Sequence, residues 1–312
     1  MPSAVDCLIV GAGPAGLTAA IYIARYHLSV QVIESGASRA ALIPCSHNHA
    51  GFPHGISGPD LLTKMRQQAE SFGVSITRGV VERLERSAGA FIVATDSGAL
   101  RARSVLLATG VTNRRPQMDD TLHAEALRRG HLRYCPVCDG YEVTDQTLAV
   151  IGSNERAINE ARFLRGFSAD VTLVGNDAGA PDEKQHAALA AMGVRWIGGP
   201  ARDFRLEADG LSFACSAGRL TFDAVYPALG SVIHSQLAVN LGAAATAEGC
   251  IKVDSHQRTD VPGLYAAGDV VIGLDQISNA MGQAGIAATT IRNDIAKDTP
   301  LLRALRPPLR NS

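Results

Sequence analysis

The chain has 312 residues, of which 46% are hydrophobic, enough for one large domain or two ordinary domains with buried cores. Its 29 Lys and Arg residues nearly balance its 30 Asp and Glu residues, and a net charge of −1 argues against a nucleic acid partner, because phosphate binding needs a clustered basic surface. No apolar run reaches the roughly 20 residues of a membrane span, and no signal segment precedes the first strand, so we expect a cytoplasmic protein.

The N-terminal segment predicts a βαβ unit. Residues 6–10 form a short apolar run typical of a buried parallel strand, and residues 17–25 are rich in Ala and Ile and favour a helix. A glycine-rich turn at residues 11–16 joins them, and residues 30–33 predict a second strand that ends at Glu34. Such a unit, about 30 residues long, is typical of nucleotide-binding folds.

The turn of this unit has the spacing of a dinucleotide-binding motif. Gly11 permits a tight turn, Gly13 lets the backbone approach a pyrophosphate, and Gly16 allows the helix to pack closely on the strand. Amides at the start of the helix would face the negative charge, and Glu34 is placed to accept hydrogen bonds from an adenosine ribose. The alternative is a glycine turn without a ligand, which the agreement of strand, turn, helix and Glu34 disfavours.

The next segment continues the alternation of helices and strands. Residues 58–60, Gly-Pro-Asp, open a predicted helix with Pro near its first position. Weaker strand signals lie at residues 80–84 and 91–94, and residues 105–109 predict a buried strand that ends in a turn at Gly110. The pattern indicates an α/β fold.

Cys135 and Cys138 are the only two of the six cysteines that lie close together in the sequence. Two thiols separated by two residues can close a small disulfide ring and reopen it, and the pKa of a thiol in such a motif can fall well below about 8.5. Asp139 follows the second thiol and is placed to carry its proton. The alternatives are half of a zinc site, for which no second pair stands at ligand spacing, and an inert structural pair.

The middle of the chain repeats the plan of the N-terminal unit. Residues 147–151 predict a strand, residues 157–164 a helix and residues 170–174 a further strand. In the connecting turn, however, Asn154 replaces the middle glycine, and Glu155 adds negative charge where a phosphate should lie. The turn therefore lacks the features of an ordinary dinucleotide site.

The end of the following strand also departs from the pattern of an NADPH site. Residues 175–177 are Gly-Asn-Asp, without the arginines that a 2′-phosphate needs, and Arg156 is poorly placed for that ribose. We therefore expect a nucleotide-type domain that has lost ordinary NADPH binding. The alternative is a rearranged site that still takes NADH or NADPH weakly.

The C-terminal part contains another glycine-containing run and a long helix. Residues 261–269, Val-Pro-Gly-Leu-Tyr-Ala-Ala-Gly-Asp, end in Gly268 and Asp269. Residues 276–295 predict a helix, and the tail at residues 306–310 is expected to be irregular.

Three further residues have both a chemical and a simpler interpretation, and a fourth has a structural one alone. Cys45 could be a third redox thiol, but an ordinary partly buried cysteine is favoured. His47 and His49 could donate protons, but such histidines more often satisfy hydrogen bonds within a loop. Trp196 follows a strand pattern and is expected to contribute to packing.

Together these motifs resemble the low-molecular-weight thioredoxin reductases, class II pyridine nucleotide-disulfide oxidoreductases, over nearly the whole chain. The resemblance rests on the turn at residues 11–16, the Ala-Thr-Gly turn at 108–110, the Cys-Pro-Val-Cys-Asp-Gly stretch at 135–140 and the run at 261–269.

The architecture implied by the resemblance is two Rossmann-like domains of the three-layer ββα type. Residues 1–114 and 246–312 would form a discontinuous FAD-binding domain. Residues 115–245 would form an inserted NADPH-type domain that carries the dithiol. The inserted domain would rotate, because the dithiol cannot face the flavin and a protein substrate in one pose.

The resemblance also assigns roles to single residues. Cys138 would face the flavin, Cys135 would exchange with the partner disulfide, and Asp139 would be the general acid and base. Asn48 would lie beside the isoalloxazine ring, and Gln276 and Ile277 would lie near the flavin ring and phosphates. The FAD-binding residues that it implies are Gly11, Gly13, Pro14, Ala15, Gly16, Glu34, Ser35, Asn48, Val81, Ala108, Thr109, Gly110, Gly268, Asp269, Gln276 and Ile277, and it implies no metal site.

The sequence departs from the family pattern in ways that concern the electron donor. Asp275 stands where the family has Arg before the matched Gln276, and the NADPH motif is broken as described. Two related groups share such a loss: ferredoxin-dependent flavin thioredoxin reductases, and gliotoxin-type dithiol oxidases, which pass electrons from a small dithiol through FAD to oxygen. The continuation through Tyr141 and Glu142 resembles the second group.

Three classes of function are compatible with these observations. The first is an FAD-dependent enzyme that reduces a thioredoxin-like protein disulfide with a donor such as ferredoxin, or with NADPH in an ordinary thioredoxin reductase. The second is a small-dithiol oxidase that uses oxygen. The third, a flavoprotein sensor without catalysis, is disfavoured because it would not need a Cys-x-x-Cys pair next to an acid. The resemblance also implies a homodimer.

Overall fold

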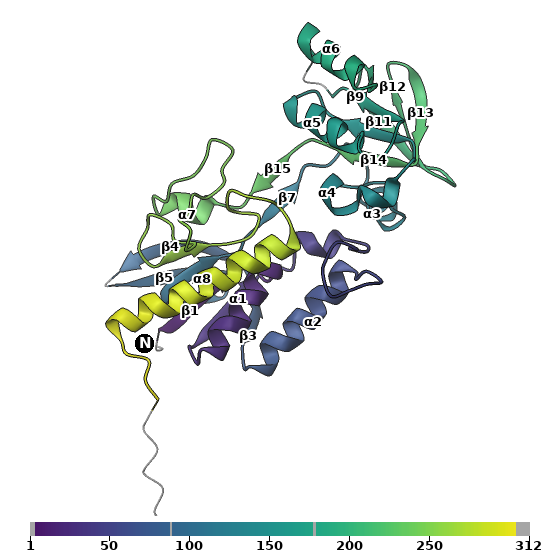
Figure 1. The fold of residues 1–312 in the computed structure, drawn as a ribbon. Helices are drawn as coiled ribbons and strands as arrows, with labels where there is room; N and C mark the ends of the chain where they lie inside the picture. The colour runs from purple at the N-terminus through teal and green to yellow at the C-terminus, as the bar shows by residue number, and fades with distance from the viewer. Residues whose placement is uncertain (1–3, 88, 177–178, 304–312) are drawn as a thin grey trace, which may run out of the picture.

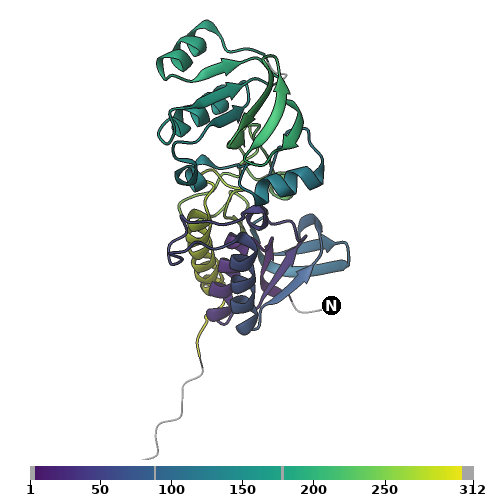
Figure 2. The same cartoon turned by 90° about the vertical axis from the view of Figure 1, so that its right-hand side faces the viewer.

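The computed structural model describes residues 4–87, 89–176 and 179–303. It is an α/β fold in two parts: the purple and blue N-terminal segments and the light-green to yellow C-terminal segments form one, and the teal to green segments between them form the other (Figure 1). The two parts remain separate after a quarter turn of the view (Figure 2). The predicted α/β class is confirmed, whereas the tail predicted at residues 306–310 lies outside the described residues.

The first part is built around a seven-stranded sheet with the order β3-β2-β1-β6-β5-β4 and with β16 beside β6. The neighbours β3, β2, β1, β6 and β16 are parallel, and β4 and β5 continue the sheet as antiparallel strands. Val10 is paired with both Ile33 and Leu107, so the carboxyl ends of β1, β2 and β6 meet at one edge. The strands are β1 (Val5–Val10), β2 (Val30–Glu34), β3 (Ser75–Arg78), β4 (Val81–Ser87), β5 (Ala90–Thr95), β6 (Gly98–Leu107) and β16 (Leu264–Ala266).

Three helices pack together beside this sheet. Helix α1 (Pro14–Arg25) contacts both α2 (Gly58–Ser71) and the long α8 (Ile277–Asp298), which runs along it in both views (Figures 1 and 2). The side of α8 that joins the shared core carries small residues, which allow two helix backbones to approach closely. These residues are Ala280, Ala284, Ala287 and Ala288. The C-terminal segment is thereby packed onto the N-terminal unit.

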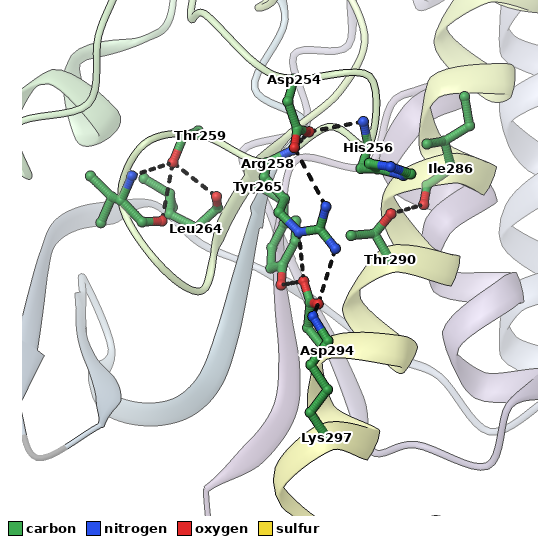
Figure 3. Close-up of polar contacts among 11 residues, drawn as sticks. Asp254, His256, Arg258, Thr259, Leu264, Tyr265, Ile286, Thr290, Asp294 and Lys297 are labelled. Carbon is green, nitrogen blue, oxygen red and sulfur yellow. Dashed lines mark hydrogen bonds and ion pairs between the residues drawn. The ribbon is translucent and has the colours of Figure 1, made fainter.

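A group of ionic contacts attaches α8 to the segment around β16. Arg258 donates to both carboxylate oxygens of Asp294 on α8, at 2.8 and 3.0 Å, and Tyr265 on β16 donates to the same carboxylate at 2.9 Å (Figure 3). Lys297 also contacts Asp294, and Asp254 contacts Arg258. The hydrogen bond from Arg258 is the main reason why the pKa of Asp294 lies below its usual value. The group fixes the orientation of α8 against the sheet.

The second part contains a four-stranded parallel sheet with the order β10-β9-β8-β14 and a three-stranded antiparallel sheet, β11-β12-β13. Leu164, Leu173 and Tyr226 are fully buried in its core, and Trp196 on β10 packs against that core as expected. Its strands are β8 (Leu148–Ile151), β9 (Val171–Val174), β10 (Arg195–Ile197), β11 (Arg202–Leu206), β12 (Leu211–Cys215), β13 (Gly218–Phe222) and β14 (Ala224–Pro227), and its helices include α3 (Asp120–Arg128), α5 (Glu155–Leu164) and α6 (Glu183–Ala191).

Two short strands carry the chain from one part to the other. Strand β7 (Val111–Asn113) leaves the first part, β15 (Ser231–Ile233) returns to it, and the two pair in antiparallel fashion (Figure 1). The remaining short elements are η1 (Arg39–Leu42), α4 (Pro136–Asp139), η2 (Tyr141–Val143) and α7 (Gln236–Asn240).

The structure moves the ends of several predicted elements. Helix α1 begins at Pro14 rather than at residue 17, because proline is favourable in the first turn of a helix. Helix α5 begins at Glu155 rather than at residue 157, because the side chain of Asn154 caps it. Strand β6 begins at Gly98 and ends at Leu107, so the predicted strand at 105–109 is its last part plus the first residues of the turn.

Candidate active site

The first glycine turn leaves the start of α1 open. Gly11 has a φ of 106°, and a Cβ there would lie 2.3 Å from the carbonyl oxygen of Ala108, so a larger residue would not fit. A Cβ at Gly16 would lie 1.9 Å from the carbonyl oxygen of Gly11, which reflects the close approach of helix and strand. Gly13 is the N-cap, and no side chain among the described residues caps the helix. The first amides of α1 therefore remain available to an anion.

Glu34 lies at the end of β2, beside this turn. Its carboxylate accepts a hydrogen bond from the Gly36 amide at 2.5 Å and one from Arg66 at 2.8 Å. The Gly79 amide donates to the Glu34 carbonyl at 3.0 Å, so the chain passes Glu34 shortly before β4 begins at Val81. Glu34, its exposed neighbour Ser35 and the segment before Val81 thus meet at the end of β2.

A cavity of about 360 Å³ extends between the start of α1 and the Cys-x-x-Cys pair, with Cys138 and Asp139 in its wall. Other predicted residues in the wall are Gly13, Pro14, Ala15, Asn48, Gly110, Gly268, Asp269, Gln276 and Ile277. Gly11, Ala108 and Thr109 lie in the adjoining turns and Gly16 in the first turn of α1, all outside the wall, as are Glu34, Ser35 and Val81. The structure therefore gathers most of the predicted flavin-side residues around one space.

Cys135 and Cys138 form a disulfide with their Cα atoms 5.2 Å apart. Gln276, just before α8, donates its side-chain amide to both sulfurs, at 3.3 Å from Cys135 and 3.1 Å from Cys138. Asn48 donates to the Gln276 side-chain oxygen at 3.0 Å and to the Val137 carbonyl at 3.4 Å. These contacts cross between the two parts of the fold and hold the disulfide against the start of α8.

Asp139 is held by two neighbours from the second part of the fold. One carboxylate oxygen contacts Arg133 at 3.1 Å, and the other accepts a hydrogen bond from the hydroxyl of Tyr226 at 2.9 Å. Burial raises the pKa of Asp139, Arg133 and Tyr226 lower it, and Glu142 raises it. The adjacency of an acid to Cys138 was read from the sequence, whereas nothing in the sequence pattern pointed to Arg133 or Tyr226 as its partners.

A second cluster that the sequence did not reveal lies beside the start of α8. Arg39 in η1 donates to Asp269 and to Asp275, at 2.9 Å in both cases. Burial raises the pKa of Asp275, and the nearby Asp269 raises it further. The chain therefore places a cation from η1 between two carboxylates, one of which stands where an Arg was expected from the family pattern.

The start of α5 differs from the start of α1. Asn154 is its N-cap, and the Asn154 side-chain oxygen accepts a hydrogen bond from the Ala157 amide at 3.2 Å. Glu155 follows in the first turn and is exposed. Gly175 and Asn176 follow β9 as predicted, and Asp177 lies outside the described residues. A helix amide that could bind phosphate is here occupied by the protein itself.

The structure gives the positions of the remaining candidates, Cys45, His47 and His49, but indicates no chemical role for them. Cys45 and His47 line the cavity, and a Cβ built on Gly55 would touch both. His49 stacks on Phe52, with the ring centres 5.5 Å apart. Within the described residues no cluster of His, Cys, Asp and Glu could hold a metal ion, and no helix is long and apolar enough to cross a membrane.

Comparison with known proteins identifies the family. A model of the pyridine nucleotide-disulphide oxidoreductases matches residues 5–284. The chain belongs to this family. It is 31% identical over 296 residues to a thioredoxin reductase from Listeria monocytogenes serovar 1/2a, and the match covers 90% of this chain and 91% of that protein.

Solved structures extend the likeness to three dimensions. The thioredoxin reductase of Streptococcus pyogenes MGAS5005 matches with a TM-score of 0.86 and 30% identity, over 95% of this chain and 100% of that one. The protein HlmI matches with a TM-score of 0.86 and 29% identity, over 95% and 93% of the two chains. Together with the family, these likenesses make this member a flavin-dependent disulfide oxidoreductase.

FAD, the cofactor that this family implies, fits the residues present. The open amides at the start of α1 suit a pyrophosphate, and a Cβ built on Gly13 would have only the Ser38 hydroxyl near it, at 3.4 Å, so the backbone there is accessible. Asp269 stands in the wall of the same cavity. Glu34 lies outside that wall, at the end of β2, where a ribose is bound in such folds.

Proposed function

We propose that this flavoenzyme passes electrons between FAD and the Cys135–Cys138 pair and on to the disulfide of a thioredoxin-like protein, with a donor other than NADPH. A reduced ferredoxin is the donor class that we favour. The observation that carries the proposal is the start of α5, where the Asn154 side chain accepts the hydrogen bond of an amide that a pyrophosphate would need.

The cost of binding NADPH at α5 has two parts. A pyrophosphate would have to displace the capping oxygen of Asn154, and it would then lie beside the negative charge of Glu155. A like charge in place of a favourable contact weakens binding by on the order of a hundredfold. NADPH at ordinary concentrations would then reduce the enzyme slowly.

In the proposed reaction, the Cys135 thiolate attacks one sulfur of the partner disulfide, whose sulfur–sulfur bond breaks. Asp139 gives a proton to the sulfur that leaves. The Cys138 thiolate then attacks Cys135, the pair closes again, and the partner is released as a dithiol that has gained two electrons. Bound FAD would supply the two-electron chemistry that reduces the pair again.

The contacts of the disulfide support different roles for its two sulfurs, with Cys138 facing the flavin and Cys135 reacting with the partner. Gln276 contacts both sulfurs from the first part of the fold, so the pair faces the proposed flavin site in this arrangement. We propose that residues 115–245 form the inserted domain and turn about the β7 and β15 connections, so that Cys135 can reach a protein partner. Residues 1–114 and 246–312 would then form the FAD-binding domain.

Anaerobic stopped-flow reduction of the bound flavin tests the donor. We expect reduced ferredoxin to bleach the flavin rapidly, and millimolar NADPH or NADH to do so at least a hundredfold more slowly. Reduction within milliseconds that saturates at micromolar NADPH would contradict the proposal and make the protein an ordinary NADPH-dependent thioredoxin reductase.

Serine variants of the cysteines test the redox pair. Cys138→Ser and Cys135→Ser should each keep FAD bound and abolish the reduction of an external disulfide, because neither variant can close the pair. Cys215→Ser, at a half-buried position on β12, is the matched control and should keep full turnover. Wild-type turnover in both pair variants would show that the disulfide is structural.

A small-dithiol oxidase is the second candidate. It is favoured by the placement of the pair, since Cys135 is only partly buried while Cys138 lines the flavin-side cavity in the same arrangement. A small dithiol could therefore reach Cys135 without domain rotation. Oxygen consumption with small dithiols, faster than disulfide reduction with any of the donors above, would favour this function over the first.

A further inference from the structure

The described part of the chain contains two groups in which an Asp carboxylate is bound by an Arg and by a buried Tyr. One is Arg258–Asp294–Tyr265, which attaches the C-terminal end of α8 to the sheet (Figure 3). The redox pair contacts Gln276 at the opposite end of this helix. The other is Arg133–Asp139–Tyr226, and its Asp directly follows Cys138. The same contacts therefore occur once in a purely architectural place and once beside the reactive sulfurs.

The second group is built from three separate segments. Tyr226 lies on β14 and is fully buried, so its hydroxyl needs a partner, and it donates to one oxygen of Asp139 at 2.9 Å. Arg133 contacts the other oxygen at 3.1 Å and is anchored by a hydrogen bond from its Nε to the Gly130 carbonyl at 2.8 Å. With both oxygens engaged, the carboxylate cannot turn freely about its side chain.

We propose that Arg133 and Tyr226 are positioning residues that hold Asp139 ionised and fixed beside Cys138, ready to accept a thiol proton. The proposal rests on the proposed role of Asp139 as the acid and base of the pair. It adds to that role two residues whose side chains contact the Asp139 carboxylate and would act through it.

The charges around Asp139 set the direction of the expected effects. Burial raises the pKa of Asp139, the ion pair with Arg133 and the hydrogen bond from Tyr226 lower it, and the neighbouring Glu142 raises it. Removing either donor leaves only one of the two partners to oppose burial and Glu142, so the pKa of Asp139 must rise. Less of the carboxylate is then ionised at neutral pH, and a step that needs the base moves to higher pH.

Comparison with the Arg258 group shows that burial decides in which direction the pKa of the carboxylate is shifted. There the hydrogen bond from Arg258 outweighs burial, and the pKa of Asp294 is lowered. At Asp139 burial outweighs the same kind of partners, and the pKa is raised. The raised pKa makes the protonated form easier to reach for Asp139 than for Asp294, so Asp139 is suited to proton exchange, whereas the ionised Asp294 serves as an anchor.

The test is the pH profile of flavin reduction by dithiothreitol in the FAD-loaded protein, measured anaerobically by stopped flow. Tyr226→Phe keeps the ring and removes the hydroxyl. We expect it to move the inflection of the rate–pH profile up by about one pH unit, which lowers the rate about tenfold at pH values below the inflection. Arg133→Met should move it further, and Arg133→Lys, which restores the charge, should move it back part of the way. The alkylation rate of Cys138 against pH, followed by mass spectrometry in a Cys135→Ser background, should shift in the same direction without depending on turnover.

Two controls separate the possible failures. Tyr265→Phe removes the equivalent hydroxyl of the architectural group; it should lower the melting temperature and leave the pH profile unchanged. Asp139→Asn should remove the inflection altogether, and an unchanged profile in this variant would overturn the role of Asp139 and the proposal with it. If Asp139→Asn removes the inflection but Tyr226→Phe and Arg133→Met leave it in place, the positioning role alone is wrong.

Discussion

Helices α1 and α5 each begin after a strand and a glycine-containing turn, and their first residues differ in one decisive way. At α1 the N-cap is Gly13, with φ −76° and ψ −175°, and no described side chain caps the helix. At α5 the N-cap is Asn154, with φ −104° and ψ 178°, and its side chain binds the Ala157 amide. The backbone is extended at both positions, so a side chain alone converts an open anion site into a closed helix end. A fold can thus be kept while its binding capacity changes.

The largest effect should come from closing α1 in the same way. We expect Gly13→Asn to weaken FAD binding at least a hundredfold, because the new side chain would take an amide and occupy the approach of the pyrophosphate. A Cβ at this position would have only Ser38 near it, so the protein should still fold. Fluorescence titration of the apoprotein with FAD measures the affinity, and the melting temperature of the apoprotein is the control. Unchanged affinity would mean that α1 does not bind the pyrophosphate.

A smaller effect is expected from opening α5. Asn154→Gly combined with Glu155→Ala should raise the rate of flavin reduction at fixed NADPH about tenfold, because it frees an amide and removes a like charge, worth about 1.4 kcal/mol. Asn159→Ala, an exposed position on the same helix, is the matched control and should leave the rate unchanged. If the double variant is reduced by NADPH no faster than the wild type, the cause of weak NADPH binding lies elsewhere in the second part of the fold.

The smallest effect concerns stability. Asn154→Ala should lower the free energy of unfolding by about 1 kcal/mol, because the Ala157 amide loses its cap, whereas Asn154→Gly should cost only a few tenths. Urea denaturation followed by circular dichroism measures both. At α1, Gly13→Ala should lower the stability of the apoprotein by only about 0.5 kcal/mol, since Ala is a poorer N-cap than Gly but no capping hydrogen bond exists there to be lost. Equal losses at the two helices would mean that the capping hydrogen bond contributes little.

Much of the architecture could be predicted because it is local. The alternation of apolar strand, glycine turn and helix at residues 6–33 and again at 147–174 fixed both parallel units, and the structure shifted their ends by only a few residues. The antiparallel strands β11 to β13 and helices α3 and α6 were not predicted. Their segments are short and lack a clear apolar period, and they are stabilised by packing on Phe204, Phe213 and Leu189 rather than by local preference.

The sequence by itself determined which residues have the chemistry. The spacing of Cys135 and Cys138 predicted a redox pair, the glycines at 11–16 predicted a turn open to a pyrophosphate, and Asn154 with Glu155 predicted a turn that has lost ordinary NADPH binding. The last prediction rested on crowding of a phosphate, and the structure adds the capping hydrogen bond as a further reason.

Only the tertiary structure decided which distant groups control those residues. Arg39 reaches Asp275 from a segment 236 positions away, and Tyr226 reaches Asp139 from 87 positions away. Such pairs leave no periodicity or spacing in the sequence, because they depend on how segments far apart in the chain pack together. The balance between burial and charge that sets the pKa of Asp139 exists only when the chain has folded around it, since water screens the same charges in the unfolded chain.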